Sequence, residues 1–303
     1  MIRYDITEVD LLILIDRQKP GWRTRAASAT ALYRRAGRYG EPDDKYWDIR
    51  RYGVPPKPFW GEIKRVYMRL QKNKCAFCER KLTVRPQDHD VEHFRPKRLV
   101  MVWPPPGTSP YIFPTGGGLP EGYYLLAYHP LNYATACEHC NRGLKRSYFP
   151  IAATRLSGKD DPIHLRPERP LLIYPIGNID TDPEALLGFK GIAPGPVNAD
   201  PDSYENHRAQ VTIDFFDLQY REELLRERAD LVQSLYLALT YENSSRKELQ
   251  NIARRTIRER TASGWQHANC ARCFVALHRR DPAQAKRFVE GATDYLDSLL
   301  PVP

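Results

Sequence analysis

Two short motifs organise this 303-residue chain: CAFC at residues 75–78 and CEHCN at residues 137–141. Each contains a CxxC pair, and 58 residues separate the first pair from the second. Four thiolates complete the tetrahedral shell that Zn²⁺ prefers in structural sites. The sequence therefore predicts a structural zinc site that holds the two ends of the intervening segment together, with four ligands: Cys75, Cys78, Cys137 and Cys140.

The segment between the two pairs contains DHDVEHFRPKR at residues 88–98. In this run Glu92 offers a carboxylate and His93 an imidazole, and three basic residues follow. Asn132 precedes the second CxxC pair, and Asn141 follows it directly. An imidazole can accept a proton from water near neutral pH, and oxygen donors suit a hard divalent ion. These residue types are the ones that metal-assisted hydrolysis of a phosphodiester needs.

Taken in order, the pattern EH…N…CxxCN behind a first CxxC resembles the HNH family of ββα-metal nucleases. The flanking segments are similar to those of the HNH subunit of Septu-type anti-phage defence systems, which also occurs beside some retrons; they include PERPLLIYP at residues 167–175. The chain departs from many HNH enzymes in having Glu92 in place of Asp and in its long gap between the CxxC pairs. Eight positions carry the resemblance: Cys75, Cys78, Glu92, His93, Asn132, Cys137, Cys140 and Asn141.

The same chemistry assigns a role to each side chain. We expect His93 to be the general base, and Glu92 and Asn141 to hold a catalytic Mg²⁺ or Mn²⁺. Asn132 is expected to orient the segment that carries His93, as its HNH counterpart does. Basic side chains beside the site would contact the phosphates of the nucleic acid; they are Arg95, Lys97, Arg142 and Arg146.

One alternative follows from strand geometry. Consecutive residues on a regular strand point to opposite faces, so Glu92 and His93 reach one site only if the strand ends or bends there. Pro96 favours an early end. On a strand that stays regular, Asp90 and Glu92 share a face and His93 does not, and the ligand assignment would then shift by a residue or two.

Composition limits the class of protein. The chain has 46 Lys and Arg against 37 Asp and Glu, a formal net charge of +9, which favours polyanionic partners such as DNA. No apolar stretch approaches the ~20 residues that cross a bilayer, and the N-terminus lacks the pattern of a secretory signal. We therefore expect a cytoplasmic protein whose six cysteines stay reduced, which favours metal ligation over disulfides.

The predicted fold class is α+β: a zinc-stabilised ββα-metal HNH core with a helical N-terminal flank and a mainly helical C-terminal domain. Helices are expected over residues 26–36 and 59–71, and a last helix begins at Asp281-Pro282. Four segments are predicted: a basic helical region at 1–58, the nuclease domain at 59–156, an acidic proline-rich linker at 157–212 with one strand at 171–174, and a helical domain at 213–303.

Two further features have an ordinary and a functional interpretation. Cys270 and Cys273 lack a partner pair, so buried thiols that pack a helical bundle are expected, with a second metal or a redox switch as the alternative. Four arginines, which are usual on a solvated helix face, could instead contact nucleic acid or a protein; they are Arg254, Arg255, Arg258 and Arg260.

The sequence thus predicts a divalent-metal-dependent HNH endonuclease acting on DNA. The resemblance implies an anti-phage defence effector that works with an ATPase or within a retron complex. The two alternatives are a zinc-stabilised nucleic-acid-binding or adaptor protein without turnover, and an HNH nuclease that cleaves RNA.

Overall fold

The computed structural model describes residues 1–83, 85 and 88–298, which form two compact units. We call them the N-terminal unit (Arg3–Ala76 and Leu82–Thr181) and the C-terminal unit (Met1–Ile2, Phe77–Lys81 and Asp182–Pro303). The boundary at residue 181 lies inside the segment expected to be a linker. Among the described residues, no helix has both the length and the apolar character needed to cross a bilayer.

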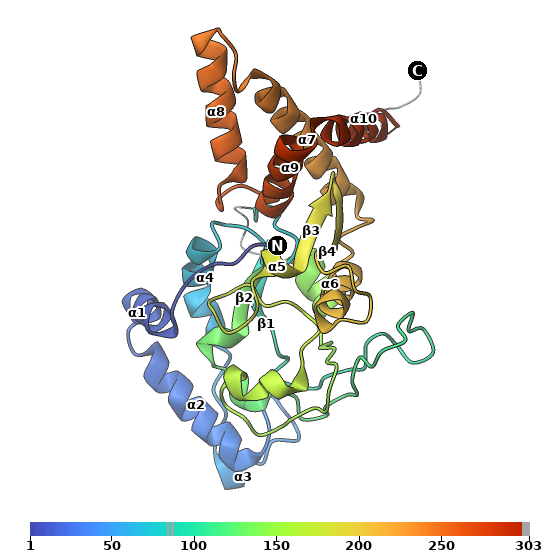
Figure 1. The fold of residues 1–303 in the computed structure, drawn as a ribbon. Helices are drawn as coiled ribbons and strands as arrows, with labels where there is room; N and C mark the ends of the chain where they lie inside the picture. Colours follow the sequence, from blue (N-terminus) through green and yellow to red (C-terminus); the bar gives the residue numbers. More distant parts are fainter. Residues whose placement is uncertain (84, 86–87, 299–303) are drawn as a thin grey trace. The chain divides into compact units, whose positions relative to one another are not determined.

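The N-terminal unit begins with a series of helices, and the predicted stretches 26–36 and 59–71 both overlap helical segments (Figure 1). The side chain of Thr7 accepts a hydrogen bond from Asp10 N and so caps the first helix. Gly21 and Gly37 flank the second helix. Both have positive φ, a backbone conformation that is strained for residues with a Cβ atom. The elements are α1 (Glu8–Gln18), α2 (Trp22–Ala36), α3 (Ile49–Tyr52), the 3₁₀ turn η1 (Trp60–Ile63) and α4 (Lys64–Leu70).

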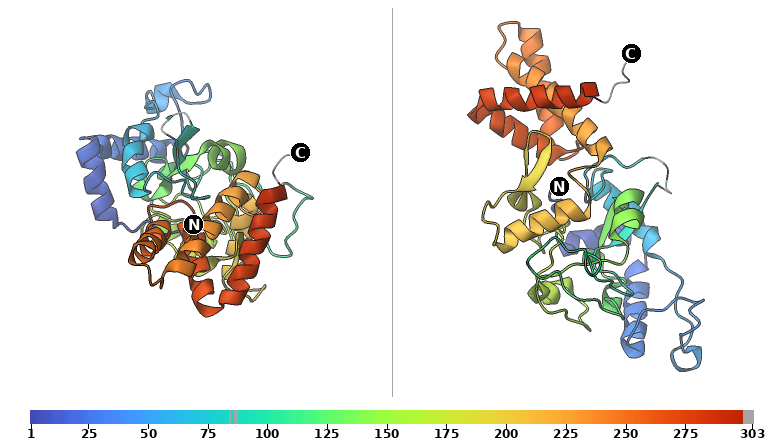
Figure 2. Two further views of the ribbon diagram at one scale, coloured as in Figure 1. Left: turned by 90° about the horizontal axis from the view of Figure 1, so that it is seen from above. Right: turned by 90° about the vertical axis from the view of Figure 1, so that its right-hand side faces the viewer.

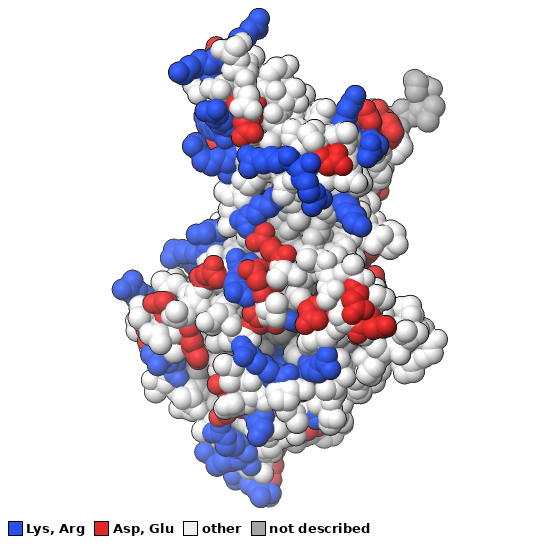
Figure 3. Space-filling view, in the orientation of Figure 1, with Lys and Arg blue, Asp and Glu red and all other residues white. Residues whose placement is uncertain are grey.

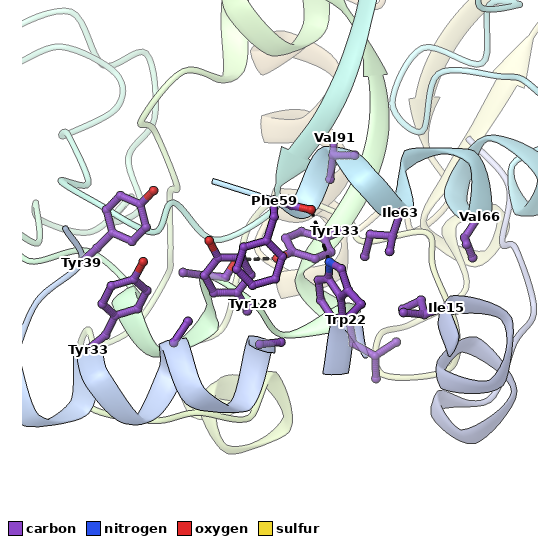
Figure 4. Packing of buried hydrophobic residues seen from close by; sticks show 14 of the residues in the cluster. Ile15, Trp22, Tyr33, Tyr39, Phe59, Ile63, Val66, Val91, Tyr128 and Tyr133 are labelled. Carbon is purple, nitrogen blue, oxygen red and sulfur yellow. Dashed lines mark hydrogen bonds between the residues drawn. The ribbon is translucent and has the colours of Figure 1, made fainter. Parts of the chain in front are cut away.

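An aromatic core holds this unit together (Figure 4). Trp22 is buried, and its indole N–H donates to the Phe59 carbonyl at 3.3 Å. The rings of Phe59 and Tyr128 stack with centroids 4.2 Å apart. Trp22 also meets Tyr133 edge-on. Residues 1–58 therefore supply part of the core of the unit that contains the segment between the two CxxC pairs.

A two-stranded antiparallel sheet lies beside this core. Strand β1 (His89–His93) pairs with β2 (Tyr133–Cys137), with His89 opposite Cys137 and His93 opposite Tyr133. The π-helical turn η5 (His139–Lys145) follows β2 and packs against both strands. The Arg146 N–H donates to the Asn141 carbonyl at 2.9 Å, which is the i→i+5 bond of a π-turn. The local order is strand, strand, helix.

The remaining part of the N-terminal unit is mostly irregular. It contains three 3₁₀ segments, η3 (Tyr124–Leu126), η4 (Pro130–Asn132) and η6 (Pro162–Glu168). The strand predicted at 171–174 is wrong: this segment is buried, and Leu171 N donates to the Pro150 carbonyl at 3.0 Å, but it joins no sheet. Its apolar residues are buried in the core.

The C-terminal unit combines a hairpin with helices (Figure 2). After α5 (Pro183–Leu186), strands β3 (Leu187–Lys190) and β4 (Ala193–Pro196) pair antiparallel. Gly191, at φ +61°, makes the turn between them. The helices that follow are α6 (Tyr204–Phe215), α7 (Glu222–Tyr241), α8 (Lys247–Thr261), α9 (Ala268–Arg280) and α10 (Pro282–Ser298).

Helices α7 to α10 pack against one another around a shared apolar core. Leu235 of α7 and Phe274 of α9 are almost completely buried there. The helix start predicted at Asp281-Pro282 is confirmed, because the Asp281 carboxylate accepts from Gln284 N at 2.9 Å and α10 begins at Pro282.

Candidate metal centre and catalytic site

The four predicted cysteine ligands come together. The Sγ atoms of Cys75, Cys78, Cys137 and Cys140 all lie within 4.8 Å of one another, and three of the four residues are buried. Four thiolates at this spacing could hold a zinc ion.

The neighbours of two sulfur atoms suit a metal-bound thiolate. The Cys137 N–H donates to Cys75 Sγ at 3.4 Å, and the almost buried guanidinium of Arg221 lies 4.0 Å from Cys78 Sγ. An N–H donor and a cation both favour the ionised sulfur, which is the form that binds metal. The residues present therefore fit a structural zinc ion.

Strand β1 keeps a regular alternation. Asp90 and Glu92 face η5: Asp90 pairs with Arg142 at 2.6 Å, and Glu92 Oε1 lies 3.5 Å from Lys145 Nζ. Between them Val91 points into the aromatic core on the opposite face. These directions match the alternative for a regular strand, in which Asp90 and Glu92 share one face of β1 and His93 does not.

His93 lies at the end of β1 between two aromatic rings. Its ring meets Trp60 edge-on at 4.7 Å and Tyr133 edge-on at 5.0 Å between centroids. Its Nε2 is 3.0 Å from the Ala127 carbonyl, which also accepts from the Tyr133 hydroxyl. A carbonyl only accepts, so Nε2 carries the proton and Nδ1 holds the lone pair of the neutral ring.

Burial controls the protonation of both candidate groups. Burial, with the nearby Lys97 ammonium, holds the pKa of His93 well below its usual value, so its imidazole is neutral at pH 7. Burial raises the pKa of Glu92 to about 7, against the opposing effect of Lys145 and Lys97. Because the same two ammonium groups act on Glu92 and His93, the two side chains share one electrostatic environment although they leave β1 on opposite faces.

Asn132 joins the two ends of a long loop. Its Oδ1 accepts from Arg95 N at 2.8 Å, and its Nδ2 donates to the carbonyls of Arg95 at 3.0 Å and Leu126 at 3.1 Å. The side chain is buried, and only an amide offers one acceptor and two donors in this arrangement. These bonds fix the backbone two residues after His93.

Arg95 does not lie where a nucleic-acid contact would. It is 3% exposed, it pairs with the buried carboxylate of Glu168, and it donates to the Leu165 carbonyl at 3.1 Å. Its guanidinium also lies over the rings of Tyr123 and Phe149. The sequence-based expectation is corrected for Arg95, which supports the loop after β1 instead.

The other predicted basic and amide residues lie closer to the surface. Lys97 is partly buried, with its ammonium 4.5 Å from the Trp60 ring centroid. Arg142 is exposed and paired with Asp90, and Arg146 is also exposed. Asn141 is half-buried in η5.

Three residues of this region were not found by sequence reasoning. Lys145 is fully buried beside Glu92, yet in the sequence it reads as one more cation of a basic segment. Trp60 stood out only as an apolar position of a predicted helix. Glu168 belongs to the flank that carried the resemblance, and its acidic side chain between two prolines was the available signal.

The remaining cysteines and the arginine-rich helix have ordinary surroundings. Cys270 lies in the core of the C-terminal unit, and burial raises the pKa of its thiol to about 12. On α8, Arg255 pairs with Glu259 at 2.8 Å and Arg260 lies over the Trp265 ring at 3.9 Å. Figure 3 shows Lys and Arg side chains gathered on the surface over α8.

Comparison with known proteins gives one relationship. Neither a protein-family model nor a solved structure matches the chain. The chain is 29% identical over 175 residues, 58% of its length, to the Septu protein PtuB of Bacillus mycoides (strain KBAB4). The matched part spans about half of that protein, at 52% of its length. The chain is thus similar to a Septu protein over more than half of its residues.

Proposed function

We propose that this protein is a metal-dependent HNH endonuclease that hydrolyses DNA phosphodiester bonds in an anti-phage defence system. The observation that carries the proposal is the packing of β1, the strand that contains Glu92 and His93, against η5, the turn that contains Asn141, next to a cluster of four cysteines. Similarity to a Septu protein supports the defence role and a partner protein. The partner that we propose is an ATPase or a retron complex.

The chemistry assigns the proton transfer to His93. Its Nδ1 accepts a proton from the attacking water, whose oxygen forms the new bond to phosphorus while the bond to the leaving oxygen breaks. Although the strand is regular, we retain Glu92 and the amide oxygen of Asn141 as the proposed ligands of a Mg²⁺ or Mn²⁺ ion, because Glu92 faces the turn that contains Asn141 while His93 leaves β1 on the opposite face. When bound, the ion would neutralise charge on the phosphate and the leaving oxygen.

The surroundings of His93 support a base that is held in place before substrate binds. The carbonyl of Ala127 selects the tautomer with a free Nδ1, and the edge-on rings of Trp60 and Tyr133 fix the plane of the imidazole. Asn132 holds the following backbone. A base fixed in this way loses little entropy when the reaction begins.

Cleavage of supercoiled plasmid in Mg²⁺ or Mn²⁺ tests the proposal. We expect His93→Ala to slow cleavage by about 10² to 10⁴-fold, the usual contribution of a general base. His164→Ala, which removes an exposed histidine of the same unit, should cleave at the wild-type rate. Equal cleavage by wild type and His93→Ala, with unchanged circular dichroism, would remove His93 as the base.

The same preparations decide between the alternatives. Matched DNA and RNA substrates separate a DNA nuclease from an RNA nuclease. DNA binding that weakens steeply with salt, without cleavage in either ion, would instead favour the adaptor function. Phage plating on cells that carry wild-type or His93→Ala protein with its partner genes tests the defence role, and we expect protection only with the wild type.

A further inference from the structure

The C-terminal unit contains a cavity that the proposed nuclease chemistry does not use. Its volume is about 410 Å³, within the range of small-molecule sites. The β3–β4 hairpin, α9 and α10 form its walls. Leu277 and Pro196 contribute apolar surface, and Gln284 is the one amide that lines it.

Two phenylalanine rings line the cavity. Phe189 of β3 and Phe288 of α10 are both partly exposed. The Arg228 guanidinium lies 5.0 Å from the Phe189 ring centroid and supports that ring. Phe288 packs so closely over Gly191 that a Cβ there would lie 2.9 Å from its ring. The two rings are therefore held by their neighbours and leave partly exposed surface for a flat ligand.

The charge of the lining is one-sided. Lys190 and Arg280 line the cavity, and among the residues that the structure describes no carboxylate does. Neither cation has an ion-pair or hydrogen-bond partner within residues 1–83, 85 and 88–298, whereas the adjacent Arg279 pairs with Glu242 at 3.2 Å. Two unpaired cations beside aromatic surface match a ligand that joins an anion to a flat ring.

We propose that this cavity binds a nucleoside phosphate, with its base against Phe189 and Phe288 and its phosphates on Lys190 and Arg280. Stacking on aromatic side chains accepts any base, so the site is expected to bind purine and pyrimidine nucleotides. The volume suits one small molecule, while a stable protein partner would need a far larger contact area. The inference concerns a separate site and does not depend on the nuclease assignment.

Displacement of a fluorescent ATP analogue (mant-ATP) from the full-length protein tests the site. We expect Arg280→Gln and Phe288→Leu each to weaken binding by about 10-fold, because each removes one of the two recognition elements. Arg287→Gln is the control, since Arg287 is an exposed cation of α10, next to Phe288 in the chain, and does not line the cavity. Inorganic tripolyphosphate should compete much more weakly than ATP.

A second measurement uses the wild-type protein alone. Cys273 lines the cavity and is half-buried, so ATP should slow its alkylation by N-ethylmaleimide, as followed by mass spectrometry. Absence of ATP binding at millimolar concentration, equal competition by tripolyphosphate, or an equal loss of affinity in Arg287→Gln and Arg280→Gln would each overturn the proposal.

Discussion

The buried ion pair of Arg95 and Glu168 supports the loop that follows β1. Both side chains are almost completely inaccessible, and Glu168 also accepts from the Tyr123 hydroxyl. Removing one member of such a pair leaves an uncompensated charge. We expect Glu168→Gln to reduce the free energy of unfolding of the N-terminal unit by about 3–5 kcal/mol, measured by urea denaturation.

The control for this substitution breaks an ion pair that is exposed to solvent. Arg142→Gln breaks the pair with Asp90, where Arg142 is 59% exposed, and should leave the urea midpoint close to that of the wild type. A Glu168→Gln protein as stable as Arg142→Gln would show that the buried pair has no net stabilising effect.

At this scale, prediction from sequence depended on how local the signal is. The cluster of four cysteines was predictable because each CxxC pair is contiguous and a structural zinc site needs thiols. Arg95 was misassigned because its partner Glu168 is distant in the chain, and a basic residue after His93 gives no indication of burial. The same holds for Lys145, whose contact with Glu92 depends on the π-turn.

Helix α7 provides a test at the scale of one element. Leu235 is fully buried between the helices of the C-terminal unit, whereas Leu237, two residues later, is 60% exposed. Leu235→Ala should lower the free energy of unfolding of this unit by about 2–5 kcal/mol through lost burial and a cavity. Leu237→Ala should change it by less than about 0.5 kcal/mol. Thermal unfolding of the two variants provides the comparison, and equal shifts would contradict it.

Helices whose apolar residues recur at helical spacing were predictable from the sequence. Elements that depend on contacts between distant residues were not. The stretches 26–36 and 59–71 and the start at Asp281-Pro282 correspond to helices because apolar spacing and capping are local signals. The segment 171–174 was predicted to be a strand because its residues are apolar. It is buried, but it pairs with no strand of either sheet. The π-helical form of η5 has no sequence signature.

The cysteine cluster provides the test at the scale of the whole molecule. A structural zinc site can contribute roughly 10–16 kcal/mol of apparent binding energy, so its loss should prevent stable folding of the segments it joins. We expect the purified protein to contain one zinc ion per chain by elemental analysis, and Cys75→Ser to lose it together with most of the thermal stability. Cys273→Ser should retain the metal.

The division of the chain also belongs to this scale. Composition distinguished four segments, but the structure groups the residues into two units and includes α1 to α3 in the N-terminal one. Residues 1–58 were predicted as a basic helical region separate from the nuclease domain, whereas Trp22 and Tyr33, which lie on α2, are fully buried in the core of the N-terminal unit. Charge counts describe the exposed face of a helix and leave its buried face undetermined.

The amide of Asn132 ties Arg95 to Leu126, and so it closes the loop between them at its base. The far part of that loop is open to solvent, and Ile112 is 97% exposed. Insertions or deletions in this far part of the loop should not move His93, because the Asn132 hydrogen bonds hold the two ends of the loop independently of its tip. A short epitope inserted next to Ile112 would therefore provide a tag for purification or labelling that leaves strand β1 undisturbed.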